Sequence, residues 1–198
     1  HGRQAIALLE RTEDWLWLGQ SYWAVGINAV LLGELDEALA TQQRAHAIGE
    51  LRGDARLLNY SDWTSGWAHA TRGDWQDGMT ACRRALDRSR DAFNTLASQA
   101  WLGYCHMEEG DSAEAARLLE PVVHDPRMIG YRAVWSWLAG YLSEALRSAS
   151  QPDRARVLAL KVLDIGSEVH ALYGIGWAQR TLGRIAQARG ALSDALVH

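Results

Sequence analysis

The heptapeptide GELDEAL at residues 33–39 decides the fold, because degenerate copies of it recur four more times along the chain. The copies are GDWQDGM from Gly73, GDSAEAA from Gly110, SQPDRAR from Ser150 and GALSDAL from Gly190. Successive copies begin 40, 37, 40 and 40 residues apart. Self-similarity at a fixed period of about 20 to 50 residues is typical of repeat architectures.

Two further small-residue positions keep register with the first residue of each copy. Seven residues earlier stand Gly26, Gly66, Gly103, Ser143 and Gly183, and five residues later stand Ala38, Gly78, Ala115, Ala155 and Ala195. A turn after a helix favours a residue that tolerates the left-handed conformation. Small residues on either side of the turn allow two helices to pack closely. The pattern therefore predicts an all-α chain of antiparallel helix pairs.

The predicted helices follow from this register and from apolar residues three and four apart. We expect pairs at 14–32/35–52, 56–72/75–92, 95–109/112–124, 130–149/152–168 and 172–189/192–198, after the end of an earlier helix at 2–12. Asp111 and Glu114 form a capping box, and Pro152 suits a first helical turn. Pro121 should kink or end its helix, which makes residues 124–127 the least regular connection.

The domain organisation has no visible boundary, because no low-complexity linker interrupts the chain. We expect one domain over residues 1–198, with repeats at about 14–53, 54–93, 94–128, 129–170 and 171–198. Since the chain starts with His1 inside a helical pattern, we also expect it to be a fragment of a longer protein.

Composition excludes several classes of protein. Of the 198 residues 48% are hydrophobic, which is enough for a packed core. A net charge of −4 does not suggest a nucleic-acid partner. Two cysteines without a CxxC motif argue against a zinc site and a disulfide framework, so we expect reduced, buried thiols in a cytoplasmic protein. No apolar run reaches the ~20 residues of a membrane helix, so no membrane partner is expected.

These residues resemble the tetratricopeptide repeat family at the turn residue and at both small-residue positions, over nearly the whole chain. Tyr22 matches the family's early aromatic residue, which later repeats follow poorly. The 40-residue period is longer than the usual ~34. It is similar to the long-period variant in bacterial signal-transduction ATPases, nucleotide cyclases and large transcriptional activators that respond to sugars. The resemblance implies a right-handed superhelix that binds partners on a concave face lined by the first helix of each pair.

Counting back from each turn residue places a set of aromatic and basic side chains on that face. As candidate partner-binding residues we take Trp23, Tyr60, Trp63, Trp67, Tyr104, Trp137, Arg147, Trp177, Arg180 and Arg184. The face would be aromatic in its first half and charged towards its end. The family's clamp for chaperone tails uses Lys and Asn on the first helices, where this chain has Trp and Ile, so a chaperone tail is a poor candidate.

The ten Trp residues have two interpretations. Trp is enriched at binding hot spots, but its large ring also fills gaps between stacked helices. We expect gap filling for Trp15, Trp17, Trp75, Trp101 and Trp135. For Trp63 and Trp67, four residues apart on one predicted face, both interpretations stay open. The arginines at the other end are either a solvated helix face or an anchor for an acidic peptide or anionic ligand.

No set of residues indicates catalysis. His69 and His106 hold equivalent positions in adjacent repeats, but a zinc site needs three or four converging ligands. Nucleophile–base patterns and phosphate-binding motifs are absent from the sequence. We therefore expect no enzyme activity, no catalytic residues, no metal and no cofactor.

Three functions remain. The leading hypothesis is an interaction module of a larger bacterial signalling or regulatory protein, which binds a peptide or protein segment in the aromatic groove. The alternative is a sensor for a sugar-like or anionic metabolite that controls an attached ATPase, cyclase or transcriptional regulator. The third is self-association through the apolar faces of the terminal helices.

Overall fold

The computed structural model describes residues 1–191, which form two compact units, residues 1–109 and 110–191. Unit 1 contains α1 (Gly2–Leu9), α2 (Trp15–Leu32), α3 (Leu35–Arg52), α4 (Ala55–Arg72), α5 (Trp75–Arg88) and α6 (Ala92–Glu109). Unit 2 contains α7 (Ser112–Val123), α8 (Pro126–Gly130), α9 (Arg132–Ser148), α10 (Pro152–Glu168) and α11 (Leu172–Ala188). The single domain expected from the sequence stays a prediction.

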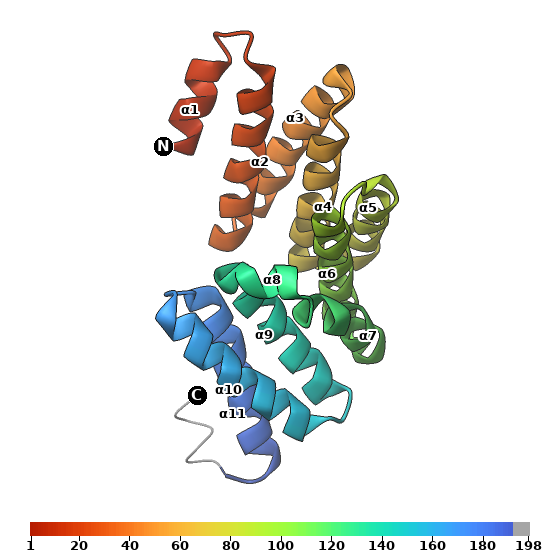
Figure 1. Cartoon of the computed structure of the whole chain (residues 1–198), viewed down its shortest axis with the longest axis vertical. Coiled ribbons are helices and arrows are strands. Elements are labelled where there is room, and N and C mark those ends of the chain that lie inside the picture. Colours follow the sequence, from red (N-terminus) through yellow and green to blue (C-terminus); the bar gives the residue numbers. More distant parts are fainter. Residues whose placement is uncertain (192–198) are drawn as a thin grey trace. The chain divides into compact units, whose positions relative to one another are not determined.

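The described residues are all-α, and consecutive helices form antiparallel pairs, as the repeat pattern predicts (Figure 1). In unit 1 α2 packs on α3 and α4 packs on α5; in unit 2 α9 packs on α10. The observed bounds lie within a few residues of the expected ones. The predicted final helix at 192–198, with Ala195, lies outside the described residues. None of the helices in residues 1–191 is long and apolar enough to cross a membrane.

The turn residue of every repeat adopts the left-handed conformation that the sequence predicts. The φ angles are 77° at Gly33, 99° at Gly73, 103° at Gly110, 61° at Ser150 and 74° at Gly190. At Gly33 and Gly73 the turn N–H groups donate to carbonyls of the last helical turn, which satisfies groups that a helix end leaves unpaired. The repeat motif is thus a helix-ending signal.

Helix starts also follow the sequence, with two differences. Asp111 accepts a hydrogen bond from the Glu114 N–H, and Pro152 occupies the first turn of α10. Pro121 lies inside α7, which ends two residues later at Val123. The connection after it was expected to be irregular, but residues 126–130 form the short helix α8. Asp125 caps that helix and Pro126 opens it, so a local signal overrides the expected loop.

Close approach of helix backbones explains the small residues. A Cβ atom built on Gly66 of α4 would lie 2.3 Å from Cys82 Sγ and 2.9 Å from the Gly78 carbonyl oxygen. A Cβ on Gly78 of α5 would in turn lie 2.9 Å from the Gly66 oxygen. In α2, a Cβ on Gly26 would meet the side chain of Gln42 on α3. Any side chain at these positions would push the two helices of a pair apart.

We predict that Gly66→Ala destabilises the protein by about 2 kcal/mol, because overpacking a filled core typically costs about 1–3 kcal/mol. Gly176→Ala in α11 is the matched control, since a Cβ there meets nothing within 4 Å. The control should be neutral or slightly stabilising, because Ala favours helix more than Gly does. Urea unfolding followed by Trp fluorescence measures both. Equal stability of the two variants would contradict the close-packing argument.

Candidate functional site

The first helices of unit 1 carry a continuous series of stacked aromatic rings, which we call the aromatic ladder: Trp23, Tyr60, Trp63, Trp101, Trp67 and Tyr104. It starts on α2, where Trp23 stacks on Tyr60 of α4 with ring centroids 4.5 Å apart. Trp23 also makes an edge contact with Trp63 and donates its Nε1–H to the Thr64 hydroxyl at 3.0 Å. The sequence-predicted residues Trp23, Tyr60 and Trp63 are therefore in mutual contact.

The rest of the ladder lies inside the protein. Trp101 of α6 stacks between Trp63, at 5.8 Å, and Trp67, at 4.2 Å, and Tyr104 meets the edge of Trp101. Trp63 and Trp67 are only 6% and 1% exposed, and Tyr104 is buried as well. The core-filling interpretation therefore describes both tryptophans. The expectation that these three rings contact a partner is corrected: Trp63 and Trp67 stack on Trp101, and Tyr104 makes an edge contact with it.

Trp23 and Tyr60 are the half-exposed end of the ladder. Stacked aromatic pairs with this spacing contribute about 0.5–1.5 kcal/mol beyond the area that they bury. The pair is thus held in place by the buried rings behind it and presents an ordered apolar surface to solvent.

The expected gap fillers divide into two groups. Trp101 and Trp135 are buried, as expected. Trp17 is 61% exposed and Trp75 also lies at the surface, which corrects the expectation for these two. Both stand in the first turn of their helices. Helical side chains point towards the helix N-terminus, so a Trp there has no preceding turn to cover. Trp15 is half-buried under the Arg52 guanidinium.

Unit 2 pairs the predicted arginines with a buried carboxylate. Arg147 and Arg184 both hydrogen-bond to Glu144 of α9, and the Thr181 hydroxyl donates to it at 3.0 Å. Burial opposes ionisation of Glu144, but the hydrogen bonds and charges of Arg147, with Arg184 and Thr181, outweigh it and lower its pKa. Both guanidiniums are therefore paired with Glu144 in the same unit, and the anchor for an acidic peptide or anionic ligand stays a prediction.

The other predicted residues of unit 2 form a second aromatic cluster. Trp177 makes an edge contact with Tyr141, and Trp137 makes one with Tyr173. Arg180 lies over the Trp177 ring, 4.6 Å from its centroid, in cation–π geometry. Trp137 and Trp177 are half-buried, and Arg180 is exposed.

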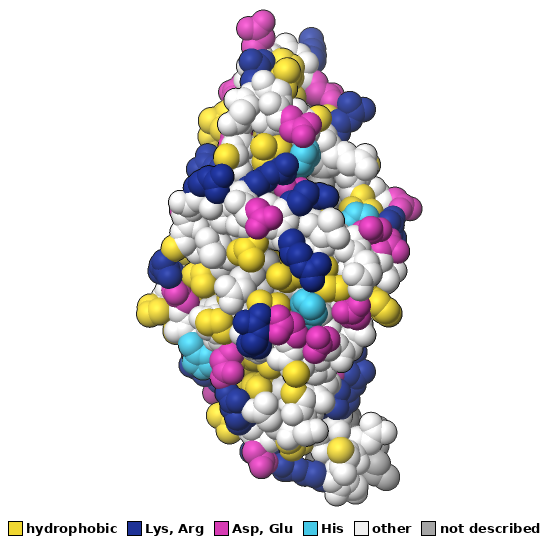
Figure 2. Space-filling model, turned by 90° about the vertical axis from the view of Figure 1, so that its right-hand side faces the viewer, with side chains coloured by type: hydrophobic (Ala, Val, Ile, Leu, Met, Phe, Trp, Pro, Cys, Tyr) yellow, Lys and Arg dark blue, Asp and Glu magenta, His cyan; other side chains and the backbone are white. Residues whose placement is uncertain are grey.

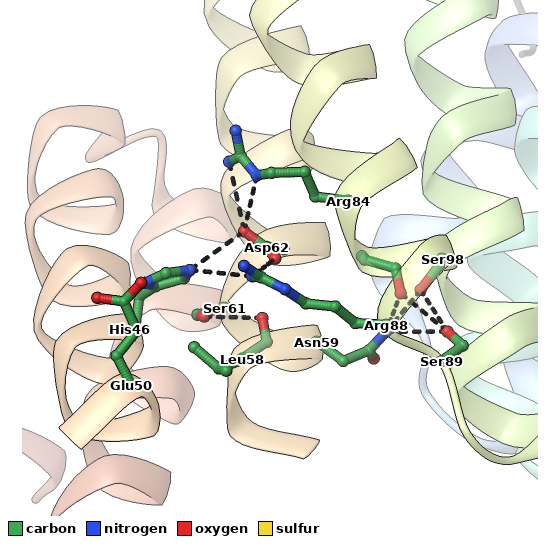
Figure 3. Close-up of polar contacts among 11 residues, drawn as sticks. His46, Glu50, Leu58, Asn59, Ser61, Asp62, Arg84, Arg88, Ser89 and Ser98 are labelled. Carbon is green, nitrogen blue, oxygen red and sulfur yellow. Dashed lines mark hydrogen bonds and ion pairs between the residues drawn. The ribbon is translucent and has the colours of Figure 1, made fainter. Parts of the chain in front are cut away.

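A polar cluster in unit 1 was not predicted. Asp62 lies in the middle of α4 and is 1% exposed. Its carboxylate accepts hydrogen bonds from Arg84 and Arg88 of α5, and His46 Nε2 of α3 lies 3.6 Å away (Figure 3). A buried charge is costly unless it is paired, so these contacts explain how Asp62 is accommodated. The available signal was an acid in the middle of one predicted helix and two arginines four residues apart in the next.

The neighbouring polar contacts fix the end of α5. The Asn59 amide donates to the Ala85 carbonyl at 2.6 Å, to the Ser89 hydroxyl at 3.0 Å and to the Ser98 hydroxyl at 3.1 Å (Figure 3). Ser89 is the residue at which α5 ends. Asn59 thus ties the C-terminal turn of α5, which carries Arg88, to α4 and α6.

The tautomer of His46 follows from the same geometry. Arg88 Nη1 lies 3.1 Å from His46 Nε2. A guanidinium is only a donor, so Nε2 accepts and the ring proton lies on Nδ1, which faces Glu50 at 3.7 Å.

Among the described residues, potential metal-ligand atoms converge at His69, Asp74 and Asp77, within 4.8 Å of one another. Asp74 accepts a 2.6 Å hydrogen bond from Arg72, which lowers its pKa and neutralises its charge. His106, expected near His69, lies 4.0 Å from Glu109. These contacts explain the cluster as surface ion pairs. Cys82 and Cys105 are buried with sulfurs 3.9 Å apart, and burial raises the pKa of Cys82 well above its ordinary value.

Comparison with known proteins supports a repeat fold. The tetratricopeptide repeat family matches residues 170–196. Two solved structures of TPR-like repeats from a protein of Podosopora anserina assigned as a kinesin light chain are similar to this chain. The first, of a variant with one substitution, has a TM-score of 0.60 at 21% identity and covers 94% of this chain and 92% of its own. The second has a TM-score of 0.58 at 20% identity, and the match covers 89% of each chain. No curated protein matches. The chain therefore has a TPR-like repeat fold, a class that generally mediates protein–protein interactions.

We predict that Asp62→Asn lowers the free energy of unfolding by about 2 kcal/mol, the range of hydrogen bonds to charged groups. Loss of the carboxylate charge leaves Arg84 and Arg88 without their anionic acceptor. Asp87→Asn is the control, because Asp87 is an exposed acid on the same helix as the two arginines. Urea unfolding at neutral pH compares the two, and equal losses would mean that the cluster contributes no specific stability.

A pH-dependent prediction concerns Glu144. Because its folded pKa is lowered, its contribution is complete above about 4.5, the ordinary glutamate pKa, and is lost as pH falls through the folded value. Glu144→Gln should therefore be less stable than the unmodified protein by about 2 kcal/mol at pH 7, and this gap should narrow below pH ~4. Glu168→Gln removes an exposed partner of Arg132 and should cost less than about 1 kcal/mol. Urea unfolding between pH 3 and 7 measures these gaps; a gap independent of pH would contradict the assignment.

Proposed function

We propose that this chain is a protein-interaction module of a larger bacterial signalling or regulatory protein, and that it binds a segment of a partner on the first-helix side of unit 1. The observation that carries the proposal is the half-exposed Trp23–Tyr60 pair at the end of the aromatic ladder. Trp and Tyr are among the residue types most often found at interface hot spots.

The buried part of the ladder supports this role indirectly. Because Trp63 packs against both Trp23 and Tyr60, the exposed rings have few accessible rotamers. Binding to an already ordered surface avoids part of the entropy cost of fixing side chains. When an apolar side chain of the partner covers these rings, apolar surface is buried, and little further side-chain entropy is lost in this chain.

The proposal that the larger protein is a bacterial signalling or regulatory protein rests on the long repeat period. A sensor for a sugar-like or anionic metabolite is the alternative, because aromatic faces also stack on planar or sugar ligands. The two proposals differ in the class of molecule that Trp23 and Tyr60 bind, a protein or a small metabolite. One experiment therefore separates them.

We predict that Trp23→Ala/Tyr60→Ala lowers the affinity for the cognate partner at least tenfold, the loss of one hot-spot contact. Affinity capture from lysate of the source cells, with mass spectrometry of retained proteins and metabolites, identifies the partner, and calorimetry then measures its affinity. Trp17→Ala is the control, since it removes an exposed Trp outside the ladder. Circular dichroism verifies the fold of each variant.

Each outcome of this experiment decides between the proposals. A protein lost from the double variant and kept by the control supports the docking role. A metabolite lost in the same way favours the sensor. A partner retained equally by all three baits contradicts a binding role for the Trp23–Tyr60 pair.

A further inference from the structure

A hollow of about 790 Å³ lies between α3, α4 and α5 on the opposite side of α4 from the aromatic ladder. Its wall includes His46, Glu50, Asp62, Ser65, Arg84 and Arg88, and we call it the Asp62 hollow. On a helix with about 100° per residue, Asp62 and Ser65 point away from Trp63 and Trp67. The volume falls in the ~300–1,000 Å³ range of ligand-binding clefts. Figure 2 shows basic side chains gathered beside a histidine in the upper part of the molecule.

The hollow has a positive wall on α5. Only 2% of the Asp62 side chain is exposed, whereas 53% of Arg84 and 34% of Arg88 are. Two guanidinium charges thus face a single carboxylate that lies beneath them. The Arg84–Asp62 hydrogen bonds are long, at 3.3 and 3.4 Å, so Arg84 is weakly held and its outer N–H groups face solvent. The α5 wall keeps a surplus of one positive charge at the surface.

The acids on the opposite wall, Glu50 and Asp36, are exposed and lie near a histidine and an arginine. Glu50 faces His46, and Asp36 of α3 lies 3.2 Å from Arg72. Asp74 is the closer partner of Arg72, at 2.6 Å, so Asp36 and Glu50 place negative charge on the α3 side, and the excess of positive charge is confined to the α5 wall. A ligand with several negative charges would be repelled by α3. A single carboxylate within an otherwise neutral, polar segment matches both walls.

The α5 wall is also ordered before a ligand arrives. Arg88 is held by Asp62 and by His46, and Asn59 fixes the helical turn that carries Arg88. An arginine held in this way presents its fork to a carboxylate with less loss of side-chain freedom. Paired arginines bind carboxylate oxygens through charge-assisted hydrogen bonds, which are about twice as strong as neutral ones.

We infer that the Asp62 hollow is a second docking surface, which receives one Glu or Asp side chain of a partner polypeptide between Arg84 and Arg88. The surrounding Ser65 and Gln43 then face the neutral polar neighbours of that acid. This inference rests on the proposed role as a protein-docking module, but it uses a different face of α4 and different residues from the aromatic ladder.

The test is an NMR titration of the ¹⁵N-labelled chain, observed at the arginine Nε–H signals. The probes are the acetylated and amidated pentapeptide Ser-Gln-Glu-Gln-Ser, the same peptide with Gln in place of Glu, and inorganic phosphate. We expect the Glu peptide to shift the Arg84 and Arg88 signals, with an affinity that weakens as salt rises. The Gln peptide should leave these signals in place.

Paired variants separate a site from general attraction to positive charge. Arg84→Gln/Arg88→Gln should weaken binding of the Glu peptide at least fivefold. Arg83→Gln/Arg90→Gln removes the same charge from exposed positions that do not line the hollow and should change the affinity for the Glu peptide by less than twofold. Since loss of both partners of Asp62 can unfold the chain, Arg84→Gln alone is the second variant; it keeps Arg88 on Asp62 and should still weaken binding at least twofold.

The inference is overturned if the two double variants weaken binding equally, if no arginine signal responds to the Glu peptide, or if phosphate binds and the peptide does not. The last outcome would make the hollow a phosphate site. None of these results bears on Trp23 and Tyr60, so the proposed function and this inference fail independently.

Discussion

The contact on which the repeat depends is the approach of two helix backbones at Gly66 and Gly78. Each of these residues would place a Cβ 2.9 Å from the carbonyl oxygen of the other, so neither can carry a side chain without moving a helix. This constraint fixes the spacing within the pair α4/α5. The turn residue Gly73, with φ 99°, reverses the chain between them. The remaining packing of unit 1, including the room for Cys82, is built around this closeness.

Close pairing also accounts for the two different sides of α4. With α5 held against its glycine side, the helix presents an aromatic side to α2 and α6 and a polar side to the gap beside α3. The aromatic side stacks Trp63 and Trp67 on Trp101, and the polar side holds Asp62 under the α5 arginines. The helix α4 therefore contributes to both candidate surfaces, but each surface uses different residues to contact a partner.

The sequence predicted the helices well because their boundaries are local. Left-handed turn residues, the Asp111 cap and the Pro152 start each act within one turn of chain, and all are realised. Side-chain environments were predicted less well because they depend on neighbouring helices. Trp63 and Trp67 have the spacing of a groove face, yet Trp101, one repeat later, covers them. The predictions for Trp17 and Trp75 were wrong for the opposite reason: at a helix start there is no preceding turn to bury them.

The environments of the charged residues likewise depend on neighbouring helices and not on local sequence. Arg147 and Arg184 are far apart in sequence, and only the packing of α9 on α11 shows that both pair with Glu144. Arg84 and Arg88 share one acid, and that acid lies deeper than either of them. A buried carboxylate that is shared by exposed arginines leaves positive charge at the surface, and the proposed docking of an acidic side chain in the Asp62 hollow depends on this charge. In unit 2, two arginines also share one acid, but the Glu144 pKa is lowered by both and Thr181 completes its hydrogen bonds. The two sites differ in how firmly the arginines are held: Arg84 lies 3.3 and 3.4 Å from Asp62, whereas Arg147 donates to Glu144 at 2.9 and 3.1 Å. The more weakly held arginine is therefore the better candidate for binding a partner's carboxylate.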